Sequence, residues 1–284
     1  MDVSILVGYV SDERYVALAD VQFEFRNGKQ VVLACSTISG AIYVDLEPGT
    51  YEVVLGKKGY GSKIVSTNIE REEPYQFRLL SDCLLGYMYP RAVTAGERSE
   101  FRVHAVEEYS LELWRYGATK EFIRRIGTFD EHGPRATMQI TPDGDYTQDG
   151  VQWNQHGYKS KILSQTIVAP ERSGLYYLHA KTKSGKFFSF PWIVAPKSPQ
   201  SDVAIFASDI NWNAYNSFGG RSNYILADKL PLTPIINSRL ELKRYTDSKH
   251  RTYDTELYAP LSLDRPDPYN HIDLDEGLTD PIEG

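Results

Sequence analysis

The sequence predicts a mainly β protein in which two tandem β-sandwiches are followed by the start of an incomplete α/β domain. Short runs of β-branched and aromatic residues alternate with turn residues over the first 195 positions, and sustained helical periodicity is missing. A continuous apolar run then follows a proline-containing boundary at residues 196–199. Evenly spaced short strands are typical of sandwiches, whereas an apolar strand that leads into a polar loop is typical of an open α/β sheet.

The first sandwich is predicted for residues 1–82. The turn Glu47–Thr50 fits a tight connection, because Pro48 fixes φ and Gly49 permits a positive φ. The stretch Leu46–Tyr60 resembles the Pro-Gly-x-Tyr…Gly-Tyr signature of carboxypeptidase regulatory-like domains, and the resemblance implies a small transthyretin-like sandwich. Seven β-rich runs are expected to be its strands: Val3–Val10, Val21–Phe25, Gln30–Ala34, Ala41–Leu46, Tyr51–Leu55, Lys63–Ile69 and Tyr75–Leu80.

The second sandwich is predicted for residues 83–197. Its stretch Ser173–Ala180 is similar to the penultimate strand of an immunoglobulin-like domain, and Pro196 and Pro199 end the block because proline disfavours both strand and helix. The clearest strands are Glu100–Val106, Ser110–Arg115, Leu175–Thr182 and Phe187–Val194. Its aromatic residues are expected in the core, with a sugar-stacking face as the alternative: Tyr176, Tyr177, Phe187, Phe188, Phe190 and Trp192.

The last segment, residues 198–284, begins with the run Val203–Ala207. This run does not alternate in polarity, so we expect a strand covered on both faces. The loop that follows places aromatic rings beside amide side chains and ends in a glycine pair, which suits a ligand site at the end of a strand; the alternative is an ordinary ordered loop. Its predicted substrate-binding residues are Trp212, Asn213, Asn216, Gly219 and Gly220, and a short helix is expected at 222–230.

Composition and charge narrow the function classes. The chain has 284 residues, 41% of them hydrophobic and 24% charged, with no apolar run of transmembrane length and no secretory signal, so we expect a cytoplasmic protein that does not contact a membrane. The net charge is −7, and the stretch from Asp264 to Gly284 carries seven acids against one base. Without a basic footprint, nucleic acid is not expected as a partner, and the acidic end is expected to be a solvated tail.

Strong catalytic motifs are absent, so no catalytic residue is assigned from spacing. There is no Gly-x-Ser-x-Gly elbow, no His-Glu-x-x-His and no phosphate-binding glycine loop, and the six histidines lie far apart. The stretch Asp143–Gly150 spaces three carboxylates like a calcium loop, but it lacks the sixth-position glycine and the distal glutamate. We therefore expect an Asp/Gly-rich turn there.

A functional resemblance comes from Ile210–Tyr224 together with Ser262–Pro266. The Trp-x-Ala-Tyr-Asn…Gly-Gly…Tyr pattern resembles the large subunit of N,N-dimethylformamidase at the start of its C-terminal α/β domain. The resemblance implies an amidohydrolase with a mononuclear iron held by tyrosine and glutamate side chains, which would polarise the carbonyl and activate water. The tyrosines that match candidate ligand positions are Tyr215, Tyr224 and Tyr269.

The length after the boundary limits this prediction. Some 85 residues follow Pro199, whereas a doubly wound domain needs several strand–helix units of about 30 residues. We therefore expect the N-terminal, accessory part of an amidohydrolase for a small amide, completed by a second subunit or a missing C-terminal half and inactive alone. The alternative is a non-catalytic tandem sandwich that binds a protein or glycan partner.

Overall fold

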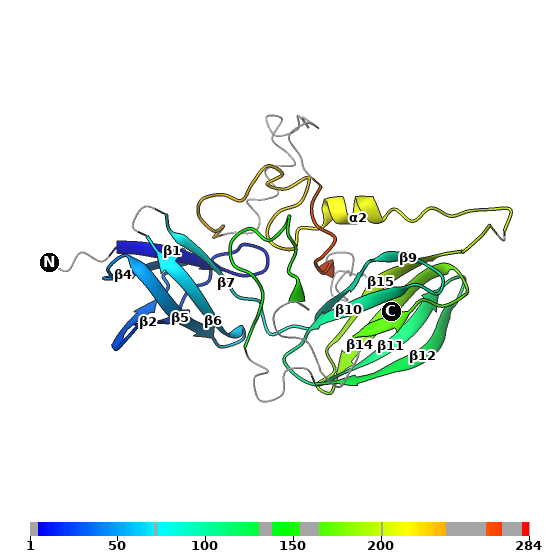
Figure 1. Cartoon of the computed structure of the whole chain (residues 1–284), viewed down its shortest axis with the longest axis horizontal. Helices are drawn as coiled ribbons and strands as arrows, with labels where there is room; N and C mark the ends of the chain where they lie inside the picture. The colour runs from blue at the N-terminus through cyan, green and yellow to red at the C-terminus, as the bar shows by residue number, and fades with distance from the viewer. Residues whose placement is uncertain are drawn as a thin grey trace. The chain divides into compact units, whose positions relative to one another are not determined.

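The chain folds into two compact units, each assembled from separate stretches of sequence (Figure 1). The computed structural model describes residues 5–70, 73–130, 138–153, 165–199, 201–236, 260–268 and 280–283. Unit 1 contains Met1–Asp82, Thr137–Gln148 and Ser217–Pro260. Unit 2 contains Cys83–Ala136, Asp149–Asn216 and Leu261–Gly284. The domain boundaries drawn from the sequence remain predictions, and the two units are described separately.

Unit 1 is a β-sandwich whose strands lie where the sequence predicts them. One sheet has the order β4-β1-β7 and the other the order β3-β2-β5-β6. Neighbouring strands are antiparallel except for β1 and β7, which are parallel. All seven expected runs are strands: β1 (Ile5–Ser11), β2 (Gln22–Asn27), β3 (Gln30–Cys35), β4 (Ala41–Val44), β5 (Gly49–Lys57), β6 (Gly61–Ile69) and β7 (Tyr75–Arg78).

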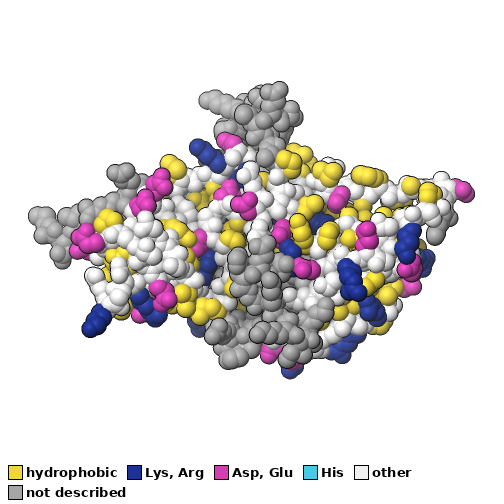
Figure 2. Space-filling model, in the orientation of Figure 1, with side chains coloured by type: hydrophobic (Ala, Val, Ile, Leu, Met, Phe, Trp, Pro, Cys, Tyr) yellow, Lys and Arg dark blue, Asp and Glu magenta, His cyan; other side chains and the backbone are white. Residues whose placement is uncertain are grey.

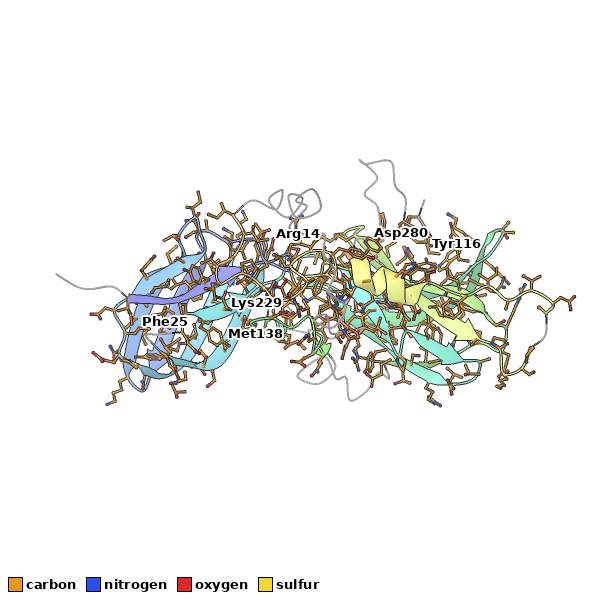
Figure 3. All side chains as sticks on the ribbon, turned by 90° about the horizontal axis from the view of Figure 1, so that it is seen from above. Arg14, Phe25, Tyr116, Met138, Lys229 and Asp280 are labelled. Atoms are coloured by element: carbon orange, nitrogen blue, oxygen red, sulfur yellow. The ribbon has the colours of Figure 1, made fainter. Side chains whose placement is uncertain are left out.

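Aromatic side chains fill the space between these two sheets. Phe23 packs edge-on against Phe77 with ring centroids 5.2 Å apart, and Phe25 packs edge-on against Tyr51 at 6.3 Å. Figure 3 labels Phe25 in this core. Burial alternates along β2 and β5, which explains why the pattern of these strands is readable in the sequence.

Unit 2 is a second sandwich, with a three-stranded sheet in the order β13-β10-β8 and a five-stranded sheet in the order β12-β11-β14-β15-β9. The four predicted strands correspond to β10 (Arg98–His104), β11 (Tyr109–Tyr116), β14 (Gly174–Thr182) and β15 (Phe187–Ala195). Four strands were not predicted: β8 (Leu85–Tyr89), β9 (Ala92–Thr94), β12 (Lys120–Phe129) and β13 (Thr166–Val168). The mainly β fold class is thus confirmed.

The aromatic residues of this block mostly form core, as expected. Tyr176, Phe188, Phe190 and Trp192 are buried, whereas Tyr177 and Phe187 are half-buried.

The run Val203–Ala207 is not the buried strand that we predicted. Val203 is 77% exposed, Ile205 94% and Phe206 87%, and hydrophobic side chains mark this segment on the surface (Figure 2). A strand must exchange backbone hydrogen bonds with a neighbour, and no strand of the described residues pairs with this run. The apolar composition of the run Val203–Ala207 is therefore not sufficient to make it a strand.

The predicted helix at 222–230 is also wrong. Ser222 Oγ accepts hydrogen bonds from the backbone N–H groups of Tyr224 and Ile225, which forms a turn in place of a helical start. The helix of this region is α2 (Asp209–Tyr215), which lies earlier in the chain. None of the helices in the described part of the chain is long and apolar enough to cross a bilayer.

Candidate functional site

Helix α2 carries the first half of the predicted ligand loop. The Trp212 N–H donates to the Ser208 carbonyl at 3.0 Å. Asp209 lies in the first turn, where its negative charge interacts favourably with the helix dipole. The helix ends at Asn216, whose φ and ψ are −65° and 111°. Asn213 is the buried residue of the helix, whereas Tyr215 is 57% exposed. Of these two neighbouring side chains, the amide of Asn213 therefore faces the protein, whereas the ring of Tyr215 faces solvent.

The two predicted amides, Asn213 and Asn216, attach the segment 260–268 to unit 2. Asn213 Nδ2 donates to the Leu261 carbonyl at 2.6 Å, and Asn216 Nδ2 donates to the Pro266 carbonyl at 2.9 Å. Both asparagines are buried. Donors that we expected to face a ligand thus bind the chain's own backbone.

A buried carboxylate, Asp264, fixes the same segment to the three-stranded sheet. Both the Tyr87 hydroxyl and Arg102 NH1 donate to its Oδ1 atom. Arg102 also pairs with Glu100 at 2.9 Å and lies over the Tyr89 ring, 4.3 Å from its centroid. Burial, and then the charge of Asp264, raises the pKa of Tyr87 well above its usual range, so the phenol stays protonated and donates. The charges of Arg102 and Asp264 are thus paired with each other and held by the Tyr87 hydroxyl, an arrangement that suits a structural anchor for the segment 260–268.

A second buried base, Arg91, lies in the same region of unit 2. Burial lowers the pKa of its guanidinium, and the nearby charges of Asp267 and Asp209 oppose that shift. Arg91 and Asp267 are both buried. Two buried charges of opposite sign, Arg91 and Asp267, therefore lie near one another in unit 2.

The predicted glycine pair lies in unit 1, because the division between the units falls between Asn216 and Ser217. Gly219 and Gly220 have φ of +98° and +93°, so the pair needs glycine. A Cβ on Gly220 would lie 2.3 Å from Tyr15 Cβ, and one on Gly219 would lie 2.6 Å from Thr147 Cγ2. The close approach that we predicted exists, and it is to the protein itself.

A fully buried arginine, Arg78, gathers the segments of unit 1. NH1 donates to the Gly144 carbonyl at 2.9 Å, and NH2 donates to the carbonyls of Asp12 and Gly219 at 2.8 and 3.0 Å. Its guanidinium lies 4.6 Å from the centroid of the Tyr146 ring, a cation–π contact. Residues from four distant parts of the sequence therefore meet at one side chain.

In the stretch Asp143–Gly150, which resembles a calcium loop, two of the carboxylates are paired with basic side chains of the protein. Asp143 pairs with Lys63 Nζ at 2.6 Å and accepts the Arg78 N–H at 2.7 Å, while Asp145 pairs with Arg221 at 3.0 Å. Within the part of the chain that the structure describes, no three His, Cys, Asp or Glu side chains are grouped so as to hold a metal. The interpretation as an Asp/Gly-rich turn fits these contacts.

The three candidate iron ligands do not meet in one unit. Tyr215 belongs to unit 2 and Tyr224 to unit 1, and Tyr269 lies outside the described residues. Of the glutamates that follow α2, the one described is Glu283, which pairs with His179 and Lys181. The two candidate tyrosines that the structure describes therefore lie in different units, and the described glutamate after α2 is paired with basic side chains.

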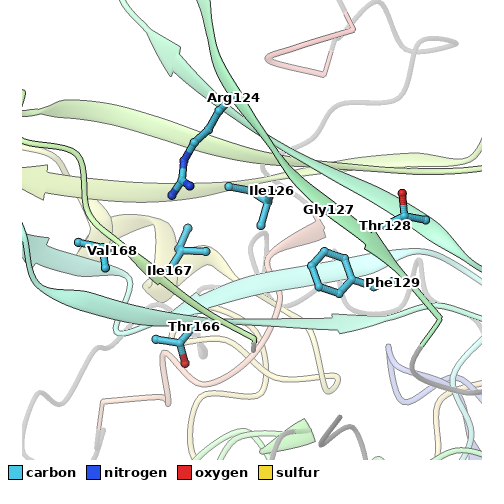
Figure 4. A pocket seen from close by; sticks show the side chains of 8 residues that line it. All are labelled: Arg124, Ile126, Gly127, Thr128, Phe129, Thr166, Ile167 and Val168. Atoms are coloured by element: carbon cyan, nitrogen blue, oxygen red, sulfur yellow. The ribbon is translucent and has the colours of Figure 1, made fainter. Parts of the chain in front are cut away.

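A cleft opens between the edge strands β12 and β13 of unit 2 (Figure 4). Its volume is about 510 Å³, and Ile126, Phe129 and Ile167 give it an apolar floor beside Arg124. None of the residues predicted for substrate or metal lines it. A second cleft of about 470 Å³ lies in unit 1 beside Tyr75 and Asp143.

Comparison with protein families gives one match. The model described as "N,N-dimethylformamidase beta subunit-like, C-terminal" matches residues 106–279. This range includes α2 and the segment 260–268. Among curated proteins, nothing matches.

Several solved structures share a weak likeness with the chain. A DUF3823 family protein from Bacteroides ovatus is 12% identical, with 67% of this chain and 97% of that chain covered and a TM-score of 0.24. A putative carbohydrate binding protein from Bacteroides uniformis is 13% identical, with coverage of 69% and 96% and a TM-score of 0.25. The Bacteroides ovatus protein SGBP-B, solved with a mixed-linkage heptasaccharide, is 11% identical, with coverage of 64% and 44% and a TM-score of 0.22. TM-scores this low support no inference about function.

Proposed function

Because the chain belongs to the N,N-dimethylformamidase beta subunit-like family, we propose that it is the N-terminal, accessory part of an amidohydrolase. In the complete protein this enzyme would hydrolyse the C–N bond of a small amide. The observation that carries the amidohydrolase part of the proposal is the family match over residues 106–279, which spans unit 2 strands, α2 and the segment 260–268.

The surface of unit 2 supports the accessory role. The exposed run Val203–Phe206 and the exposed residues Ile210 and Tyr215 place apolar side chains next to one another in the sequence, at the start of and along α2. Apolar surface gains free energy when it is buried, at roughly 25 cal/mol per Å². We propose that a catalytic portion covers this segment, supplied by a partner subunit or by further chain. The family description as a beta subunit supports a partner subunit.

The role of the chain's own residues would be to position α2. Asn213, Asn216 and Asp264 hold the helix and the segment 260–268 against unit 2 with buried hydrogen bonds. That anchoring would fix Trp212 and Tyr215 at the edge of the amide site, where aromatic walls exclude water. The iron and its ligands Tyr215, Tyr224 and Tyr269 are proposed from the family resemblance alone.

The test is the release of dimethylamine and formate from N,N-dimethylformamide. Two proteins are assayed in parallel, the 284-residue chain and the longest protein encoded by its gene. Each is tested unaltered and as the Tyr215→Phe variant. We expect turnover by the longer protein, little by the chain alone, and a loss of turnover and bound iron on Tyr215→Phe.

Tyr43→Phe is the matched control, because Tyr43 is also an exposed tyrosine but lies on β4 of unit 1. It should leave turnover unchanged. If the longer protein is inert towards small amides and binds no iron, the amidohydrolase proposal is wrong and the binding-module alternative is favoured.

A further inference from the structure

The five-stranded sheet of unit 2 binds a short acidic stretch from the far end of the chain. Residues 280–283, Asp-Pro-Ile-Glu, lie against side chains of β12, β14 and β15. Asp280 and Ile282 are buried there, so this end is not the solvated tail that the sequence predicts. Figure 3 labels Asp280 in this unit.

The first acid of the stretch is bound at a buried hydroxyl. Ser189 Oγ, fully buried on β15, donates to Asp280 Oδ1 at 2.7 Å. The same oxygen accepts the backbone N–H groups of Ile282 at 2.8 Å and Glu283 at 3.1 Å. The carboxylate therefore both anchors the stretch and shapes it into a turn.

The second acid is bound by two basic side chains of β14. Lys181 Nζ lies 2.8 Å and His179 Nε2 lies 2.9 Å from Glu283 Oε1. Lys181, and to a smaller extent His179, lowers the pKa of Glu283 and so favours its charged form. Lys120 Nζ on β12 donates to the Ile282 carbonyl at 2.9 Å. Two acids and one backbone carbonyl are thus recognised over a stretch of four residues.

The hydrogen-bond directions require a doubly protonated histidine. The single hydroxyl proton of Ser189 is donated to Asp280, because a carboxylate only accepts. Ser189 Oγ must then accept from His179 Nδ1, which lies 2.8 Å away. His179 Nε2 faces the Glu283 carboxylate and must donate as well. Both ring nitrogens therefore carry protons when both acids are ionised.

The surroundings of His179 can hold this positive charge. Glu112 of β11 lies directly opposite His179 in the strand register, and Asp280 and Glu283 add two more carboxylates. Lys181 is the base on the same strand that faces Glu283. Three carboxylates therefore lie near His179, and two further bases, Lys181 and Lys120, contact the same stretch.

We propose that this face of unit 2 is a docking site for a short acidic peptide of the pattern Asp-Pro-apolar-Glu, bound in the turn that residues 280–283 adopt. Residues 280–283 fill the site within the chain, and an acidic segment of a partner protein would compete for the same contacts. A tethered ligand has a high effective concentration, so a weak intrinsic affinity is enough to keep the site filled.

The experiment measures binding of the fluorescently labelled peptide Asp-Pro-Ile-Glu by anisotropy. It uses the full chain with Asp280→Asn and Glu283→Gln, which weakens the chain's own hold on the site. We expect the peptide to bind this variant about tenfold more tightly than the unaltered chain, in which the site is filled.

Matched variants separate specific docking from charge attraction. Lys181→Met in the weakened chain should abolish peptide binding, whereas Lys197→Met should not, since Lys197 is an exposed lysine that pairs with Glu171. The neutral peptide Asn-Pro-Ile-Gln should not bind. Equal binding of the two peptides, or no binding to the weakened chain, would overturn the proposal. Glu283→Gln alone repeats the measurement if the double variant does not fold.

Discussion

The two sandwiches each bury an arginine to hold distant segments, but they surround it differently. In unit 1, Arg78 donates to backbone carbonyls and lies against the rings of Tyr15 and Tyr146. In unit 2, Arg102 is paired with the carboxylates of Glu100 and Asp264. The charge of Arg78 is stabilised by carbonyl dipoles and aromatic rings, whereas the charge of Arg102 is neutralised by carboxylates.

This difference determines which substitutions each unit can tolerate. A buried ion pair can be replaced as a pair, because removing both charges also removes both desolvation costs. A guanidinium that satisfies several carbonyls has no single partner to remove with it, and each orphaned carbonyl costs free energy. Unit 1 should therefore be the less forgiving of the two.

The largest effect is expected at Arg78. Arg78→Met leaves the carbonyls of Asp12, Gly144 and Gly219 without their donor in a buried site, and should lower the free energy of unfolding by about 3–5 kcal/mol. Urea denaturation measures the loss. Arg26→Met on the exposed side of β2 is the control, with an expected cost below about 1 kcal/mol.

A double substitution in unit 2 sharpens the contrast. Arg102→Met alone should cost about 3–5 kcal/mol because it leaves Asp264 as a buried, unpaired charge. Adding Asp264→Asn should recover much of that loss, since the neutral amide can still accept from Tyr87. If the double variant is no more stable than Arg102→Met, the two arginines do not differ in the way described.

Gly220→Ala should be next in size. A Cβ at Gly220 would meet Tyr15 Cβ at 2.3 Å on a backbone with φ of +93°, so strain and overpacking add to about 2–4 kcal/mol. Gly59→Ala separates the two causes, because Gly59 has φ of +84° but open space around it. Thermal unfolding of both variants should show the smaller loss, about 1–2 kcal/mol, for Gly59→Ala; equal losses would rule out the packing contribution.

A pH-dependent effect is expected at Asp12. Burial, and then the charge of Glu13, raises the pKa of Asp12 to about 6, above its ordinary value of 3.8. The protonated form is therefore favoured by folding, so this contribution to stability is complete below about pH 4 and is lost as the pH rises through 6. Asp12→Asn should stabilise the chain by about 1–3 kcal/mol at about pH 8 and by little at about pH 4.

The Asp12 measurement is a series of urea titrations from about pH 4 to about pH 8. In the Asp12→Asn variant, the amide oxygen of the new side chain can still accept the N–H groups of Arg14 and Val16, so the turn should survive. A parent and variant whose stabilities run parallel across this range would contradict the assignment.

The smallest effect is expected at the asparagines of α2. Asn216→Ala removes a buried hydrogen bond to the Pro266 carbonyl and should cost about 1–2 kcal/mol in unit 2. Asn68→Ala, which removes an exposed contact to Glu70, should shift the melting temperature less. A negligible effect of Asn216→Ala would mean that the contacts of Asn213 and Asp264 suffice to hold the segment 260–268.

Local pattern was enough to predict the strands of unit 1 but only half of those of unit 2. Alternating burial along β2 and β5 leaves a period of two in the sequence. The missed strands lack this signal: β8 is buried at four successive positions, β9 has three residues, and β12 is a largely exposed edge strand. Their places are set by pairing with strands elsewhere in the chain.

The sequence singled out unusual residues in the segment 211–224, but it did not show what they contact. The sequence predicted a ligand role for Asn213, Asn216 and the glycine pair, because amides and positive φ angles are locally recognisable, whereas in the structure these residues contact the chain itself. Their partners lie tens of residues away, at Leu261 and Pro266, and no local signal identifies them. Arg78 and Asp264 were missed for the same reason.

The long reach of Arg78 also matters while the protein is being made. Its acceptor at Gly219 lies 141 residues further along the chain. At about 5–20 residues per second, a ribosome needs about 7–30 s to synthesise that interval. All seven strands of the first sandwich thus leave the ribosome before the last hydrogen-bond acceptor of Arg78 has been synthesised. Closure of the N-terminal unit should therefore lag behind its own synthesis, and a nascent chain arrested before residue 219 should expose the guanidinium to chaperones and proteases.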